Sequence, residues 1–589
     1  MKKIITIISL FVLLVVHNAC DTLDIENIYS YDANKVWNDE KLINSYMANL
    51  YAKVFENWNV SLDQKTQQLS GIHFYLDRIT ISNGEYKKWN YTTIRLINEA
   101  IQNTTNGDLP QAKKDEFIAQ AYFLRAYVYF QMVIYHGGIP YLTIPQDKNK
   151  DELYVKRNST KECFELIVKD LNEAISMLPE KIQPSSGNYG KIDACFASAF
   201  KAKVLLYKAS PQFNPNNKWD NVYWQEAYEA NKQAYTKLVA NGSKLTGDYA
   251  NIFLVEKGFE VVFAVINTYP NKMANWDNGV RPGSESRGPA SSCPTWNFIQ
   301  DFPMKDGKLY NDPSGKYYKT DDVFLQRYWE NRDPRFEKSI VWNGSIYEVS
   351  GKVGKRQYTS LGIAHEMDDF GVNPKAGVNS TNLDRSSGFF IRKASDLSLK
   401  QAEVQQYDVD FILMRFAEVM LNYAETANET GKSDVAIDIL KQIRERAGIE
   451  PGEDGLYGIK ASSREDIREA ILAERNIEFC FEGHRFWDLR RLRMLDRLDK
   501  KTKYGVEAIA VNPDGTEMSM TEAKSKAASM KLTEYDFKYS LLQIPITGVK
   551  VTSVPDSYYF FPIQKDVIDR NSNIEQNSNW GGTFNPALD

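Results

Sequence analysis

The stretch from residue 408 to residue 491 constrains the fold of this chain more than any other. Gly431 predicts the end of a first helix, and Ser433 predicts the N-cap of a second helix that ends at Gly448. Two amphipathic helices with a short connection predict an αα-hairpin, the unit from which tetratricopeptide-like solenoids are stacked. Apolar and small residues form one face of the first helix at helical spacing: Leu413, Phe416, Ala417, Met420, Ala424 and Ala427.

A second helical pair follows directly. Ser462 and Glu465 have the spacing of a capping box and predict the start of the next helix. Paired carboxylates could serve acid–base catalysis, but neither a nucleophile nor a set of metal ligands accompanies them. The pattern favours charged helix faces joined by ion pairs. The charged residues recur at or near helical spacing: Glu474, Glu478, Glu482, Arg475 and Arg485.

The N-terminal part of the chain repeats this helical character. Together with residues 408–495 it predicts a mostly α fold, a tetratricopeptide-like α-α superhelix of about four helical hairpins. Between these blocks, residues 241–407 are rich in Gly, Pro, Asn and Ser. They contain the β-like runs EVVFAVIN, KSIVWNG and GFFIRKAS and predict an irregular, loop-rich insertion with short β-strands. Further helices are predicted over residues 35–56, from about Trp89 to Ile101, over 112–135, in a hairpin within 155–214 that Ser159 and Thr160 cap, and over 224–240.

The N-terminus predicts export. Two lysines precede the apolar run 4–16, which is too short to span a membrane and is typical of a signal peptide. Cys20, followed by an acidic stretch, is interpreted as the acylated cysteine of a lipoprotein after removal of residues 1–19. The alternative is simple secretion with an unpaired cysteine.

Composition argues against several classes of function. A net charge of −5 without a basic excess argues against nucleic-acid binding, and five cysteines and five histidines argue against a disulfide framework or a zinc site. His365-Glu366 lacks the second histidine of a zinc protease, and neither a phosphate-binding glycine loop nor a nucleophile elbow is present. We therefore expect no catalytic set, metal or cofactor, although counting carboxylates leaves a two-carboxylate glycosidase open.

A ligand-binding surface is easier to locate than a catalytic one. Aromatic residues make up 13% of the chain, and sugar rings stack their C–H faces on such side chains while polar groups meet their hydroxyls. The rival interpretation for Trp89 and Trp296 is burial against a helix. Two loop regions have the required mixture, and their candidate ligand-binding residues are Tyr75, Arg78, Trp89 and Asn90 in the first, and Trp276, Asn278, Arg281 and Trp296 in the second.

Several stretches together resemble the SusD/RagB family, the surface nutrient-binding lipoproteins of Bacteroidetes-type bacteria. The resemblance runs from Cys20 to Trp580, and its motifs occur in the family's order. It implies a single SusD-like domain over residues 20–589. In that domain the helical scaffold would cover 35–240 and 408–495, the ligand-binding segment 241–407, and a loop-rich C-terminal segment 496–589. The stretches include FLRAYVYFQMVIYHGGIPYL, RFAEVMLNYAETANETG, IRERAGI, AERNIEFCFEGHRFWDLRRL and YFFPIQKDVIDRNSNIEQNSNW.

The resemblance also implies a function. It predicts a lipid-anchored outer-membrane protein, exposed at the cell surface, that binds a glycan without enzymatic activity. The expected partner is a SusC-like TonB-dependent transporter, to which the protein would deliver an oligosaccharide. The alternatives are a member of the same architecture that binds a peptide or another nutrient, and an exported glycoside hydrolase.

Overall fold

The computed structural model describes residues 33–71, 79–288, 290, 292–360, 363, 387–499, 502–544 and 553–589. The signal peptide expected over residues 1–19 and Cys20 lie outside these ranges. Within them, no helix combines the length and the apolar character that crossing a bilayer requires.

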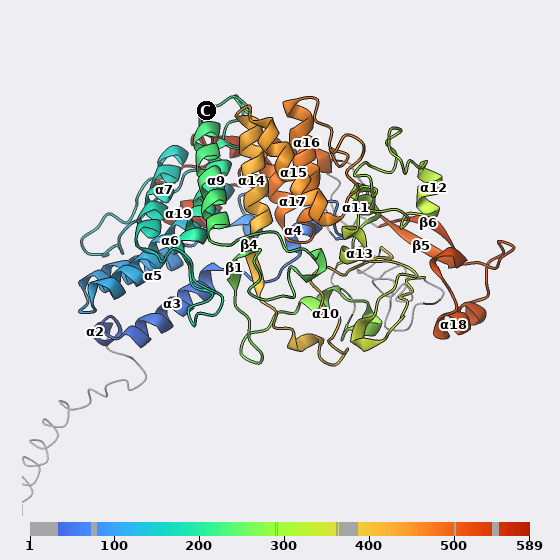
Figure 1. Cartoon of the computed structure of the whole chain (residues 1–589). Coiled ribbons are helices and arrows are strands. Elements are labelled where there is room, and N and C mark those ends of the chain that lie inside the picture. The colour runs from blue at the N-terminus through green and yellow to red at the C-terminus, as the bar shows by residue number, and fades with distance from the viewer. Residues whose placement is uncertain are drawn as a thin grey trace, which may run out of the picture.

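Helices packed side by side form the larger part of the molecule (Figure 1). Each helix from α5 to α9 packs on the next one, and α14 then packs on α9, so the stack continues in space without residues 241–415. This arrangement confirms the prediction of a mostly α, tetratricopeptide-like stack from which a loop-rich insertion projects. The helices of the stack are α2 (Ala33–Val36), α3 (Glu40–Val54), α4 (Ser61–Gln64), α5 (Tyr91–Asn106), α6 (Gln111–His136), α7 (Thr160–Met177), α8 (Ala194–Ala209), α9 (Tyr223–Ala240), α14 (Phe416–Glu429), α15 (Ser433–Ala447), α16 (Arg464–Glu478) and α17 (His484–Arg491).

Helix α14 lies at the centre of the stack, and all of its side chains are buried. Helices α9, α15 and α16 contact it, and its alanines allow this close approach. The predicted stop at Gly448 is confirmed, because this residue caps α15 in the left-handed conformation with a φ of 83°. Ser159 likewise forms the predicted cap of α7, in a capping box with Glu162.

Three local predictions were wrong in detail. Leu413 lies in strand β4 (Phe411–Arg415) rather than in a helix, because this short apolar run pairs antiparallel with β1 (Val261–Val265). The N-cap of α16 is Ser463 and not the predicted Ser462. The Ser463 side chain accepts a hydrogen bond from the backbone amide of Asp466. Ser433 is the first residue of α15 and its hydroxyl bonds Asn428, so it does not cap the helix.

The insertion has a hydrophobic core of its own beside that of the stack. The three predicted β-like runs are confirmed as strands β1, β2 (Ile340–Val341) and β3 (Phe390–Ile391), the last two being paired antiparallel. The C-terminal region contains an antiparallel pair that the sequence analysis did not identify, β5 (Tyr504–Ala510) and β6 (Phe537–Gln543). The remaining helices are α10 (Trp276–Val280), α11 (Trp296–Asp301), α12 (Asp321–Gln326), α13 (Arg335–Ser339), α18 (Met520–Ala528) and α19 (Lys565–Arg570).

Ion pairs join the insertion to the stack. Glu478 of α16 accepts hydrogen bonds from Arg335 of α13 and Arg415 of β4, at 2.8 and 2.7 Å. Glu474 bonds Arg335 and Arg444 in the same way. The predicted ion pairing of these glutamates is confirmed, and both carboxylates are buried.

Candidate functional site

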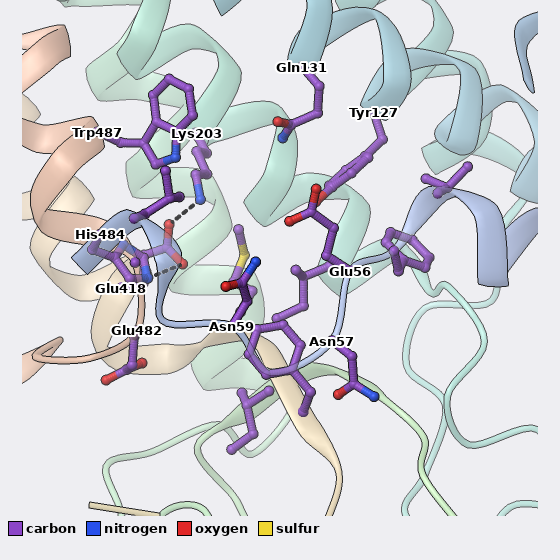
Figure 2. A pocket seen from close by; sticks show the side chains of 18 of the residues that line it. Glu56, Asn57, Asn59, Tyr127, Gln131, Lys203, Glu418, Glu482, His484 and Trp487 are labelled. Carbon is purple, nitrogen blue, oxygen red and sulfur yellow. Dashed lines mark ion pairs between the residues drawn. The ribbon is translucent and has the colours of Figure 1, made fainter. Parts of the chain in front are cut away.

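A cavity of about 600 Å³ opens beside the centre of the stack. Helices α3, α6, α8, α14 and α17, strand β4 and the segments around residues 56–62 and 88–90 line it. Its volume falls within the range of about 300–1,000 Å³ that is typical of small-molecule sites. Figure 2 shows the side chains that point into it.

The floor of the cavity carries a cluster of three polar side chains from three helices. Lys203 of α8 lies 2.8 Å from Oε1 of Glu418 on α14, and Nε2 of His484 on α17 lies 4.0 Å from Oε2 of the same carboxylate (Figure 2). Although it is ion-paired, the Glu418 carboxylate accepts no hydrogen bond of ordinary geometry from the described residues. The cluster therefore combines a buried anion with a cation and an imidazole that are partly open to the cavity.

Burial and neighbouring charges set the protonation of this cluster. Burial raises the pKa of Glu418, but Lys203 and His484 outweigh it and hold the pKa below its usual range. Burial lowers the pKa of His484 to about 4, although Glu418 opposes this shift. At neutral pH the glutamate of the floor is thus ionised and the imidazole is uncharged.

Aromatic rings form the walls. Tyr135 of α6 and Trp487 of α17 lie 5.3 Å apart between ring centroids, with their planes inclined by 55°. Both are half-buried and line the cavity, and Tyr127, which also lines it, lies on the same face of α6 about two turns before Tyr135. Such rings expose apolar faces on which the C–H face of a sugar can stack.

Side-chain amides line the cavity together with these rings. Gln131 of α6 and Asn90, just before α5, make no side-chain hydrogen bond to any described residue. Asn57 and Asn59 also line the cavity, and the Nδ2 of Asn57 donates to Asn267 at 2.8 Å. Amides without a protein partner are available to a ligand that carries hydroxyl groups.

Most charged groups of the lining are paired. Lys88 lies 3.0 Å from Glu56 at the rim. Deeper in the cavity, Arg415 lies 2.9 Å from Glu482, and Arg475 lies 2.8 Å from Asp488. The cavity therefore presents polar groups with little net charge.

The residues predicted to bind a ligand are found in different places. Asn90 is exposed and lines the cavity. Its neighbour Trp89 is half-buried, with its ring 5.2 Å from that of Tyr91, and packs against the C-terminal segment. Tyr75 and Arg78 lie outside the described residues.

The four candidates in the insertion do not line the cavity. Trp276 is only 5% exposed and donates its indole N–H to the Lys393 carbonyl at 3.1 Å. Trp296 is 3% exposed and packs on aromatic rings of the insertion. Arg281 is fully buried and ion-paired, and half-buried Asn278 accepts the amide of Arg287 at 3.0 Å.

This placement is at odds with ligand contact by Trp276, Trp296 and Arg281. The apolar indole surfaces are buried in the core of the insertion, where each ring removes a large area from water. The Arg281 guanidinium bonds Asp277 and the Leu399 carbonyl, and because its side chain is fully buried a ligand cannot reach it. For Trp296, the rival interpretation of burial matches its position.

The sequence analysis missed most of the cavity lining. Tyr135, Trp487 and Lys203 belong to helices that were predicted correctly, but they were assigned to the helical scaffold. The available signal was polar residues on otherwise apolar helices, namely Gln131 in YFQMVIY and Glu418 at the start of the buried helix α14. Within the described ranges, no three His, Cys, Asp or Glu side chains converge so as to hold a metal ion.

Comparison with known proteins identifies two family models along the chain. The model of the SusD family matches residues 259–580, and a model described as "Starch-binding associating with outer membrane" matches residues 21–206. SusD-like protein P38 of Formosa agariphila is 24% identical over 438 residues, which cover 70% of this chain and 73% of that protein. A SusD-like protein of Bacteroides ovatus is also 24% identical and covers 72% and 69%.

Solved structures share the fold. A SusD-like protein from Bacteroides fragilis has a TM-score of 0.71 at 24% identity, with 93% of this chain and 98% of that chain covered. A laminarin-binding SusD-like protein has a TM-score of 0.54 at 18% identity, with 92% and 99% covered. The SusD family model covers more than half of the sequence, and the chain described here belongs to the SusD family.

Proposed function

We propose that the cavity binds an oligosaccharide, which the protein captures without altering it. The observation that carries this proposal is the combination, in one cavity of about 600 Å³, of half-buried aromatic rings with amides that have no protein partner. Tyr135 and Trp487 would lie along sugar faces, and Asn90 and Gln131 would bond hydroxyl groups. Of the residues predicted from the sequence, Asn90 is retained in this site.

The carboxylates of the cavity favour binding over catalysis. Glycoside hydrolysis by two carboxyl groups needs one that stays protonated, with a raised pKa. Burial raises the pKa of Glu482, but Arg415 and Lys393 lower it to about 2. The pKa values of Glu418 and Asp488 also lie below the usual range, because neighbouring cations outweigh their burial. These three groups are poor proton donors at neutral pH.

The wider role that we propose is delivery to a transporter. The signal peptide and Cys20 predicted from the sequence would place the protein, lipid-anchored, on the outer membrane, and the second family model describes association with that membrane. Several relatives are named SusD-like, and one structural neighbour is named as binding laminarin. We propose that the partner is a SusC-like TonB-dependent transporter that receives the captured glycan.

Affinity electrophoresis tests the binding proposal. We expect the protein to be retarded in a native gel that contains starch, laminarin, xylan or mannan. The double variant Asn90→Ala/Gln131→Ala should bind the same polysaccharide about tenfold more weakly, because each lost hydrogen bond costs about 0.5–1.5 kcal/mol. The control Gln102→Ala/Asn106→Ala removes the same two residue types from exposed positions of α5 that do not line the cavity.

Three outcomes would contradict the proposal. The first is migration that none of the four polysaccharides retards. The second is equal retention of both double variants. The third is release of reducing sugar during incubation with the retained polysaccharide, which would indicate hydrolysis. Capture of peptides from a casein digest in place of any glycan would instead support the peptide-binding alternative.

A further inference from the structure

The polar floor of the cavity has a composition that restricts the ligand further. Each lining carboxylate faces a cation: Glu56 faces Lys88, Glu418 faces Lys203, and Glu482 faces Arg415. Asp488 is paired with Arg475 in the same way. A ligand with its own negative charge would therefore meet carboxylates directly behind the cations that attract it.

Lys203 has donors that the described residues do not use. Its side chain ends in three N–H groups, and its one ion-pair partner among the described residues is the Oε1 of Glu418, at 2.8 Å. The side chain remains 22% exposed, at the cavity, while that of Glu418 is 1% exposed. Glu418 thus holds the Lys203 side chain in place and neutralises its charge. The N–H groups of Lys203 that Glu418 does not bind face the cavity.

His484 offers a second group of this kind. Its ring stacks on Phe479 at 4.6 Å between centroids, which fixes the plane of the imidazole. Neither ring nitrogen makes a hydrogen bond to the described residues, and the closest carboxylate oxygen is 4.0 Å away. An uncharged imidazole can donate to one hydroxyl oxygen and accept from another.

We infer that this floor recognises the terminal ring of an uncharged oligosaccharide. Lys203 and His484 contact its hydroxyl groups, and Glu418 is a positioning residue that holds Lys203 and neutralises it. The inference rests on the proposed function and names the ligand class of the same cavity. The buried side chains of Asn422, Arg475 and Asp488 belong to the same part of the lining, and in this inference a sugar chain reaches them by its end.

The test uses simple glycosides on the intact protein. The probes are the methyl glycosides of the sugars that make up the retained polysaccharide, together with methyl glucuronide as an acidic probe. Saturation-transfer NMR titrations measure their affinities. We expect wild-type protein to bind a neutral methyl glycoside at least tenfold more tightly than methyl glucuronide.

The variant Glu418→Gln tests the positioning role. It should bind the neutral glycoside about tenfold more weakly, because Lys203 loses its charged partner. Its affinity for methyl glucuronide should rise, because the Lys203 charge is no longer cancelled. This reversal of preference is a readout that a purely structural role of Glu418 would not change. Lys203→Met, which keeps the aliphatic stem, should weaken both probes.

The control is Glu429→Gln on the same helix. Glu429 is also a buried, ion-paired carboxylate, 2.7 Å from Arg468, but it does not line the cavity. It should leave both affinities unchanged. A Glu418→Gln variant with wild-type affinities for both probes would overturn the positioning role, and tighter wild-type binding of methyl glucuronide would overturn the uncharged class.

Failure of the inference differs from failure of the proposed function. If the polysaccharide is retained in the gel but no methyl glycoside binds, the protein binds the interior of a glycan chain. This result would overturn recognition of the terminal ring but not glycan binding. If no polysaccharide is retained either, the inference and the proposed function are both overturned. If the glycosides bind and lose affinity in Lys203→Met but not in Glu429→Gln, both are supported.

Discussion

At the scale of single residues, Asp63 is the clearest case of burial deciding chemistry. Its side chain is fully buried in α4, beside the cavity wall. Oδ1 accepts the amide of Gly483 at 3.0 Å, while Oδ2 has no partner among the described residues. Burial raises the pKa of this carboxyl to about 8, although the Gly483 hydrogen bond opposes the shift. Asp63 is therefore mostly protonated in the folded protein at pH 7 and ionised in the unfolded chain.

The raised pKa predicts an unusual pH dependence. Between about pH 4 and pH 8 the folded state binds a proton that the unfolded state releases, so this group lowers stability as the pH rises. Asp63→Asn keeps the acceptor for Gly483 and cannot ionise. We expect the variant to exceed wild type in unfolding free energy by on the order of 5 kcal/mol at pH 8, and by little at pH 4.

Urea unfolding at the two pH values measures this difference. The control Asp438→Asn changes an exposed aspartate of α15 and should alter stability at neither pH. A loss of stability in Asp63→Asn that is the same at pH 4 and at pH 8 would show that the carboxyl is ionised in the folded protein, contrary to this account.

At the scale of elements, the caps of the helices offer a local test. Ser159 is exposed, its Oγ accepts the amide of Glu162 at 3.2 Å, and a Glu162 carboxylate oxygen accepts the Ser159 amide at 2.8 Å. Ser159→Ala removes a cap without removing core packing. We expect the variant to lower the local unfolding free energy at the start of α7 by about 1 kcal/mol. Faster native-state hydrogen exchange of the first-turn amides would measure this loss.

Ser176 supplies the matched control near the other end of α7. It is exposed, and its hydroxyl donates only to the Glu173 carbonyl of its own helix. Ser176→Ala should leave first-turn exchange unchanged, because alanine is a better helix former than serine. Equal exchange rates in wild type and Ser159→Ala would mean that tertiary packing alone fixes the start of α7.

Elements that local signals specify were predictable from the sequence. The bounds of α6 and α9 follow from apolar periodicity with glycine or proline stops, and the cap of α7 follows from the capping box. Strand β4 was taken for helix because its apolar run is short and its partner β1 lies about 150 residues earlier. The β5–β6 pair was missed for a similar reason, since pairing partners separated by a long connection leave no local signature.

The cavity was less predictable than the fold. Aromatic residues in loops were favoured as ligand contacts, but whether an indole is open or buried depends on partners that are distant in sequence. The rings of Trp276 and Trp58 pack with their centroids 4.7 Å apart, although Trp58 lies more than 200 residues earlier in the chain. The cavity brings Asn90, Lys203 and Trp487 together from three parts of the chain, and only the stacking of the helices places them side by side.

At the scale of the whole molecule, buried ion pairs connect the insertion to the helical stack. The Glu478 carboxylate accepts hydrogen bonds from Arg335 of the insertion, from Arg415 of β4 and from Arg446 of α15. Burial raises the pKa of Glu478, but these cations outweigh it and hold it well below the usual range. One carboxylate thus joins three parts of the chain, while the single domain over residues 20–589 stays a prediction from the sequence.

Replacing this carboxylate should uncouple those parts. Glu478→Gln leaves three buried guanidinium groups short of a counter-charge, and breaking a buried pair in this way costs about 3–5 kcal/mol. We expect limited proteolysis to cut the insertion of Glu478→Gln before the stack, whereas wild type loses both together. Glu429→Gln removes a buried carboxylate whose partners, Arg464 and Arg468, both belong to α16. It should destabilise the stack without releasing the insertion, and identical cleavage patterns for the two variants would show that Glu478 does not couple insertion and stack.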